Sequence, residues 1–174
     1  MSDFKAINIS SEAEFLAHML ALKNESEERL QTLADCLYAH NNSRAAEVFQ
    51  QLANDLAESI RLLEDKAAGI ELPNIPPWEY QWHCSNNPEA LCMDHAHYLM
   101  SMRQALELAL FNEQRGLAFL QRIHDEVADA SIRALSSEQI DIEQRFAERL
   151  REWMLGLPED EAMCDDLDPP HMPE

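Results

Sequence analysis

The stretch SRAAEVFQQLANDLAESIRLLEDKAAG, residues 43–69, carries the pattern that decides the fold. Its apolar residues recur every three or four positions: Ala45, Phe49, Leu52, Leu56 and Leu63. That spacing gathers them on one side of an α-helix, which we predict to run over residues 43–68. Ser59 shares this inner face, and Gly69 stands where helices often end in a left-handed residue.

The same periodicity predicts three further helices. The first begins at Ser11, where Ser11 and Glu14 form a capping box, and ends at the Asn41-Asn42 pair. The others cover residues 101–127 and 132–155. The short link after the first helix makes the first two antiparallel, and the long crossover over residues 70–100 lets the second and third run parallel. The sequence therefore predicts an all-α fold, a four-helix bundle built from two antiparallel helix pairs with one long crossover between the second and third helices.

Three segments follow from this pattern: an extension over residues 1–10, a bundle over residues 11–157, and a tail over residues 158–174. The tail is acidic and contains no Lys or Arg, so we predict that it is disordered.

The composition restricts the partners. The 174 residues include 33 acidic and 13 basic side chains, for a net charge of -20. A chain this acidic repels nucleic acid and anionic membranes, so neither partner is expected. No apolar run reaches the roughly 20 residues that a membrane helix needs, and we recognise no signal peptide. We therefore expect a cytoplasmic protein with reduced thiols.

The crossover contains two groups of residues that could have a function. The first could ligate a soft metal, but its spacing matches no standard site, so we predict loop and packing roles: His83, Cys84, Cys92, His95 and His97. The second is an aromatic group that could dock a partner, although burial within the monomer is the simpler prediction: Trp78, Tyr80 and Trp82.

Several stretches in this order resemble the rubrerythrin-like branch of the ferritin-like superfamily. They are ERLQTLAD at 28–35, HNN at 40–42, AAEVFQQLA at 45–53, PWEY at 77–80, ALELALFNE at 105–113 and EQRF at 143–146. The resemblance spans residues 11–155 and implies a ferritin-like bundle that forms a homodimer. The rubredoxin module found in rubrerythrins is missing.

In that family, two helices each supply a Glu and the other two each supply Glu-x-x-His to hold two irons. The resemblance maps these six ligands onto Lys23, Leu56, Ser59, Glu113, Glu143 and Phe146. Only Glu113 and Glu143 suit iron, so we predict a degenerate site with no catalytic residue, metal or other cofactor. A shifted register could instead recruit one of three other acids: Glu25, Glu58 or Glu138.

Without iron, Glu113 and Glu143 would be buried acids, which is costly unless a cation or a proton compensates them. We expect the Lys23 ammonium to bridge them, and Leu56 and Phe146 to fill the remaining space. The sequence thus predicts a non-catalytic binding or interaction protein whose protein partner the sequence does not identify. Two alternatives remain: an oxidoreductase or iron-handling protein with a reduced carboxylate site, and a small-molecule binder that uses a cavity at the former metal position.

Overall fold

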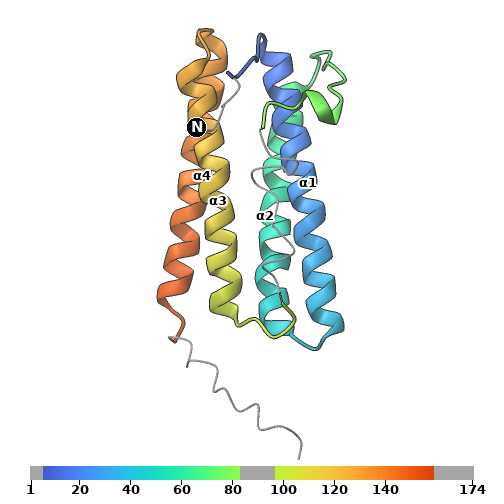
Figure 1. The fold of residues 1–174 in the computed structure, drawn as a ribbon, viewed down its shortest axis with the longest axis vertical. Helices are drawn as coiled ribbons and strands as arrows, with labels where there is room; N and C mark the ends of the chain where they lie inside the picture. The colour runs from blue at the N-terminus through green and yellow to red at the C-terminus, as the bar shows by residue number, and fades with distance from the viewer. Residues whose placement is uncertain (1–5, 83–96, 159–174) are drawn as a thin grey trace, which may run out of the picture.

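The computed structural model describes residues 6–82 and 97–158, and in these ranges it contains helices and no strand. Four long helices form the bundle in Figure 1: α1 (Glu12–Ala39), α2 (Ser43–Ala67), α3 (Met102–Glu126) and α4 (Ala130–Leu155). A short 3₁₀ helix, η1 (Pro77–Glu79), lies in the crossover. The α1–α2 and α3–α4 pairs are antiparallel, whereas α2 and α3 run in the same direction (Figure 1). The predicted fold class is confirmed.

Short-range hydrogen bonds set the helix ends. The Ser11 side chain accepts from the Glu14 amide, which confirms the predicted cap of α1, and the Asn42 side chain accepts from the Ala45 amide and caps α2. Gly69 adopts a left-handed φ of 80°, as predicted after α2. The second half of the predicted capping box is wrong, because the Glu14 carboxylate accepts from the amide and hydroxyl of Ser10 instead.

α4 begins two residues earlier than predicted. The Asp129 side chain accepts hydrogen bonds from the amides of Ser131 and Ile132, which lets the helix start at Ala130. The start of α3 has a full capping box between Ser101 and Gln104, which the sequence prediction did not include.

The hydrophobic core consists of two clusters, one near each end of the bundle. The lower cluster, near the α1–α2 loop in Figure 1, includes Leu33, Leu37, Phe49 and Leu106. The upper cluster, at the opposite end, includes Phe15, Leu16, Leu63, Leu120 and Ile123. Between the clusters lies a short section where buried polar side chains replace apolar ones, and this section contains the candidate site.

The segments outside the helices also pack against the bundle. Ile9 is buried in the upper cluster, and the Ile7 amide donates to Glu126 on α3, so residues 7–9 are part of the folded structure. Asn42 donates to the carbonyls of Tyr98 and Met100, which fixes the end of the crossover beside the start of α2. No helix in the described ranges is both long and apolar enough to cross a membrane. The predicted tail lies almost entirely outside those ranges.

Candidate functional site

A cavity of about 90 Å³ lies between the two clusters and is lined by side chains from all four helices. The six predicted ligand positions all line this cavity: Lys23, Leu56, Ser59, Glu113, Glu143 and Phe146. Lys23 comes from α1, Leu56 and Ser59 from α2, Glu113 from α3, and the other two from α4. The prediction that Leu56 and Phe146 would fill this space is wrong. Both are only partly buried, and the cavity remains open beside them.

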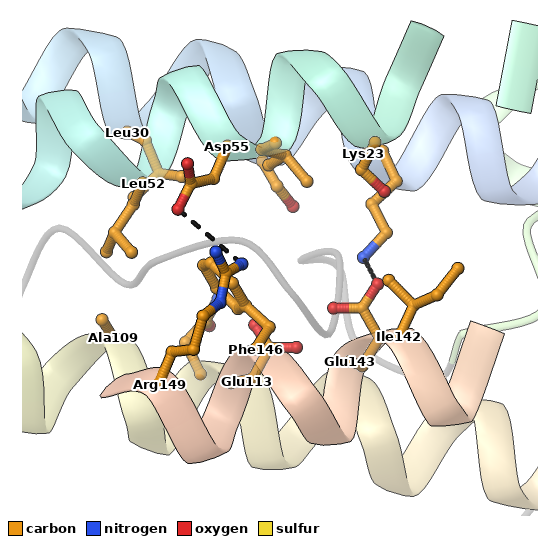
Figure 2. A pocket seen from close by; sticks show the side chains of 14 residues that line it. Lys23, Leu30, Leu52, Asp55, Ala109, Glu113, Ile142, Glu143, Phe146 and Arg149 are labelled. Atoms are coloured by element: carbon orange, nitrogen blue, oxygen red, sulfur yellow. Dashed lines mark hydrogen bonds and ion pairs between the residues drawn. The ribbon is translucent and has the colours of Figure 1, made fainter. Parts of the chain in front are cut away.

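Lys23 and Glu143 form a buried ion pair at one end of the cavity (Figure 2). The Lys23 Nζ atom donates to Glu143 Oε1 at 2.6 Å, and the side chains are 1% and 6% exposed. Charge-assisted hydrogen bonds of this length are strong, and they offset part of the cost of taking both charges out of water. The predicted contact between Lys23 and Glu143 is confirmed, and the predicted bridge to Glu113 stays a prediction.

The pKa of Glu143 reflects two opposing effects. Burial raises this pKa, because a desolvated carboxylate is unfavourable. The positive charge of Lys23 and hydrogen bonds from Glu113 and Lys23 lower it more, so the pKa lies below its ordinary value of 4.5. Lys23 and Glu113 therefore both favour the ionised form of Glu143, against the effect of its burial.

A second ion pair lies at the outer part of the cavity. Arg149 of α4 and Asp55 of α2 approach within 3.9 Å, and the Arg149 side chain is 63% exposed. Its guanidinium carbon also lies 5.2 Å from the centre of the Phe146 ring. The cavity thus extends from a buried ion pair to a pair in contact with solvent. The sequence prediction placed neither Asp55 nor Arg149 in the site, although each is close in sequence to a predicted ligand position.

The side chains present do not suit a di-iron centre. The irons of a di-iron carboxylate bundle are held by carboxylate and imidazole ligands. At the corresponding positions of this chain, Leu56 and Phe146 have no donor atom, and Ser59 has only a neutral hydroxyl. The Lys23 ammonium would also repel a cation placed at Glu143. Within residues 6–82 and 97–158, no three His, Cys, Asp or Glu side chains gather closely enough to hold a metal ion.

The three acids of a shifted register lie outside the cavity, and each forms an ion pair. Glu25 pairs with Arg29 along α1, and Glu58 pairs with Arg61 along α2. The third acid, Glu138, pairs with Lys66 at 2.9 Å, between α4 and α2. The structure therefore brings none of these three acids to Glu113 and Glu143.

The three aromatic side chains of the crossover differ in their burial. Tyr80 and Trp82 are half-buried, and both rings pack against the buried His18 of α1, while Trp82 also contacts Phe119 of α3. Trp78 is 83% exposed. Within the predicted histidine and cysteine group, only His97 is described, and it is exposed. The others, His83, Cys84, Cys92 and His95, lie outside the described residues.

Comparisons with known proteins give one informative relationship. No family model and no curated protein matches this sequence. The structure is similar to the crystal structure of COG1633, an uncharacterized conserved protein from Magnetospirillum magnetotacticum MS-1, with a TM-score of 0.65 and 30% sequence identity. The match covers 88% of this chain and 99% of that one. With this identity over nearly its full length, the chain belongs to the COG1633 family of uncharacterized conserved proteins, within the ferritin-like and rubrerythrin-like group.

Proposed function

We propose that this protein is a metal-free, non-catalytic member of the ferritin-like group that acts as a binding module. The buried ion pair carries the proposal. Lys23 Nζ lies 2.6 Å from Glu143 Oε1, so a protein ammonium provides the positive charge that this acid needs. A lysine at this point both satisfies the carboxylate and opposes the entry of a metal cation.

The cavity supports a binding role. It has room for a few non-hydrogen atoms, and the exposed Arg149 at its outer part indicates a route from solvent. Its lining combines apolar side chains with a small number of polar groups, which is typical of ligand sites. Leu56 and Phe146, which replace ligands in the family pattern, form part of its apolar wall.

Metal analysis tests this proposal. Protein expressed in medium supplemented with iron and manganese should contain less than about a tenth of a metal ion per chain, since too few carboxylate or imidazole ligands are present. The matched variant restores the family pattern through Lys23→Glu, Leu56→Glu, Ser59→His and Phe146→His. This variant should bind iron if the cavity is a degenerate metal site.

Near-stoichiometric iron in the wild-type protein, lost in Glu113→Ala, would contradict the proposal. That result would favour the alternative, an oxidoreductase or iron-handling protein with a reduced carboxylate site. If the four-residue variant folds but does not bind iron, this cavity does not correspond to the position of the metal site in the family.

We also propose that the protein forms a homodimer, as the resemblance to its family implies. One chain has a mass of 20.0 kDa, so light scattering after size exclusion distinguishes a dimer from a monomer directly. Exposed apolar side chains on three helices offer contact area: Leu62 of α2, Phe111 of α3 and Leu155 of α4. A monomer at high protein concentration would contradict this proposal.

A further inference from the structure

A surface pocket of about 450 Å³ lies beside the start of α1. It is formed by the segment before α1, the first turn of α1 and the crossover, which lies alongside the upper part of α1 in Figure 1. Its volume is within the range of about 300–1,000 Å³ that is usual for ligand pockets. It shares no lining residue with the cavity between the helix pairs, so a ligand there would bind independently of that cavity.

Trp78 lines this pocket and is mostly exposed, although it is the largest apolar side chain of the crossover turn. The turn that displays it is well defined. Pro76 and Pro77 lead into η1 with φ fixed by their rings, and the amides of Glu79 and Tyr80 donate to the carbonyls of Pro76 and Pro77. The backbone therefore holds the indole at the surface.

The turn is also tied to its neighbours in space. Gln81 Oε1 accepts a hydrogen bond from the Asn8 amide at 2.9 Å, and Gln81 Nε2 donates to the Glu79 carbonyl at 3.0 Å. The Trp82 ring, directly after this residue, packs against the buried His18 of α1. The walls of the pocket are thus in place before a ligand binds, which lowers the entropic cost of binding.

The charged groups that line the pocket are acidic. They are the carboxylates of Glu14 and Glu79, and within the described ranges no Lys, Arg or His lines it. Glu14 Oε2 accepts from Ser10, whereas the Glu79 carboxylate has no hydrogen-bond or ion-pair partner among the described residues. Asn8 and Asn74 also line the pocket and carry amide oxygens that accept hydrogen bonds. An aromatic face beside carboxylates favours a cationic ligand.

We propose that this pocket binds an arginine side chain from a basic segment of a partner protein. The guanidinium stacks on the Trp78 indole and donates to the Glu79 carboxylate. Arginine fits better than lysine, because its planar group both stacks on an aromatic face and donates in several directions, whereas an ammonium is a compact and strongly hydrated charge. The net charge of -20 also attracts a basic segment over a longer range. This inference goes beyond the proposed function, because it adds a surface outside the cavity and a class of protein partner.

A titration of the full chain with the peptide acetyl-Gly-Arg-Gly-amide, in sodium chloride of about 0.15 M, tests the inference. We expect saturable chemical shifts of the Trp78 indole N–H and of amides around the pocket, with a dissociation constant in the millimolar range. An exposed cation–π contact and an exposed ion pair each contribute little, which sets this weak affinity. The peptide with citrulline in place of arginine keeps the shape without the charge and should give no saturable shift. The lysine peptide should bind at least about twofold more weakly than the arginine peptide.

Two variants locate the site, and each has a matched control. Trp78→Leu should weaken binding of the arginine peptide about two- to fivefold, observed through the amides around the pocket. Glu79→Gln should weaken it by a similar factor, and the double variant about tenfold. Phe111→Leu and Glu107→Gln make the corresponding changes at exposed positions of α3 and should leave binding unchanged. Circular dichroism and a thermal melt confirm that each variant is folded.

Four outcomes would overturn the inference. They are the absence of saturable shifts around the pocket, equal binding of the citrulline peptide, equal binding of the lysine peptide, and losses in the two α3 controls as large as those in the Trp78 and Glu79 variants. Metal content of the same preparation decides the proposed function separately. Stoichiometric iron would overturn that function and leave the arginine site standing, because the two sites share no residue.

Discussion

Lys23 and Glu143 are more deeply buried than charged side chains usually are. Each charge offsets the cost of burying the other. Taking each charge out of water costs several kcal/mol, and the hydrogen bond between them returns much of that energy. The pair therefore contributes little net stability compared with an apolar pair of the same shape. The loss of one partner is different, because the other remains as an uncompensated buried charge.

Lys23→Met should lower the free energy of unfolding by about 3–5 kcal/mol, because Glu143 would then be buried without its cation. Denaturant unfolding measures this change. The double variant Lys23→Met, Glu143→Leu should recover most of the loss, since apolar replacements of buried ion pairs are often neutral or stabilising. A double variant as unstable as the single one would show that packing, and not charge, controls this position.

The lowered pKa of Glu143 predicts a pH dependence with a defined sign. The folded state holds this proton less tightly than the unfolded state, so the pair stabilises the fold above about pH 4.5. The contribution decreases as the pH falls through the lowered pKa of the folded state. The difference in unfolding free energy between wild type and Glu143→Gln should therefore decrease below pH 4.5. A difference that does not change between pH 7 and pH 3 would contradict this.

At the scale of the helices, the starts and stops were predictable because each depends on a few neighbouring residues. Ser11, Asn42 and Gly69 all act at the helix ends where the sequence placed them. The predicted start of α4 was wrong by two residues, because the Asp129 carboxylate caps the helix and lets it begin at Ala130.

The contents of the site were less predictable than the helix ends. The periodicity placed Leu56 and Phe146 on inner faces, but whether they fill the space between helix pairs depends on the separation of those pairs. That separation is a tertiary property that spacing along one helix does not reveal. The Asp55–Arg149 pair was missed for the same reason, since α2 and α4 meet only after the crossover.

Asn42 links two elements, and its substitution should therefore cost more than an ordinary helix cap. Its oxygen caps α2, and its amide nitrogen donates to the carbonyls of Tyr98 and Met100 at 3.0 and 2.8 Å. Asn42→Ala should lower the free energy of unfolding by about 2–4 kcal/mol.

Asn42→Ser is the matched control for that substitution. Serine keeps an oxygen that can cap α2 but lacks the amide that reaches the two carbonyls, so its loss in chemical denaturation should be clearly smaller than that of Asn42→Ala. Equal losses for the two variants would mean that the cap contributes nothing and the contact with the crossover dominates.

For the whole molecule, the net charge of -20 is the dominant electrostatic feature. Repulsion among the excess acids favours expansion of the chain. The exposed ion pairs, such as Arg61 with Glu58, oppose this expansion only weakly, because water and salt screen the attraction between exposed charges. Added salt should therefore weaken the repulsion between the acidic side chains more than it weakens the attraction within the ion pairs, and so stabilise the folded state.

The melting temperature should rise as sodium chloride is increased from about 0.01 M to about 0.1 M, where the screening length falls from about 30 Å to about 10 Å. Differential scanning calorimetry at constant pH measures this. Sodium perchlorate at the same concentrations separates screening from specific anion effects. A fall in melting temperature with both salts would show that attractive surface pairs outweigh the repulsion.

Three ion pairs connect α4 to the α1–α2 hairpin: Lys23 with Glu143, Asp55 with Arg149, and Lys66 with Glu138. Apolar surfaces tolerate sliding, because one leucine can replace another in the same groove. Charged pairs do not, since a displacement by one helical turn of about 5.4 Å would separate every partner. We expect the buried Lys23–Glu143 pair, with a weak contribution from the two more exposed pairs, to favour one axial alignment of the two hairpins.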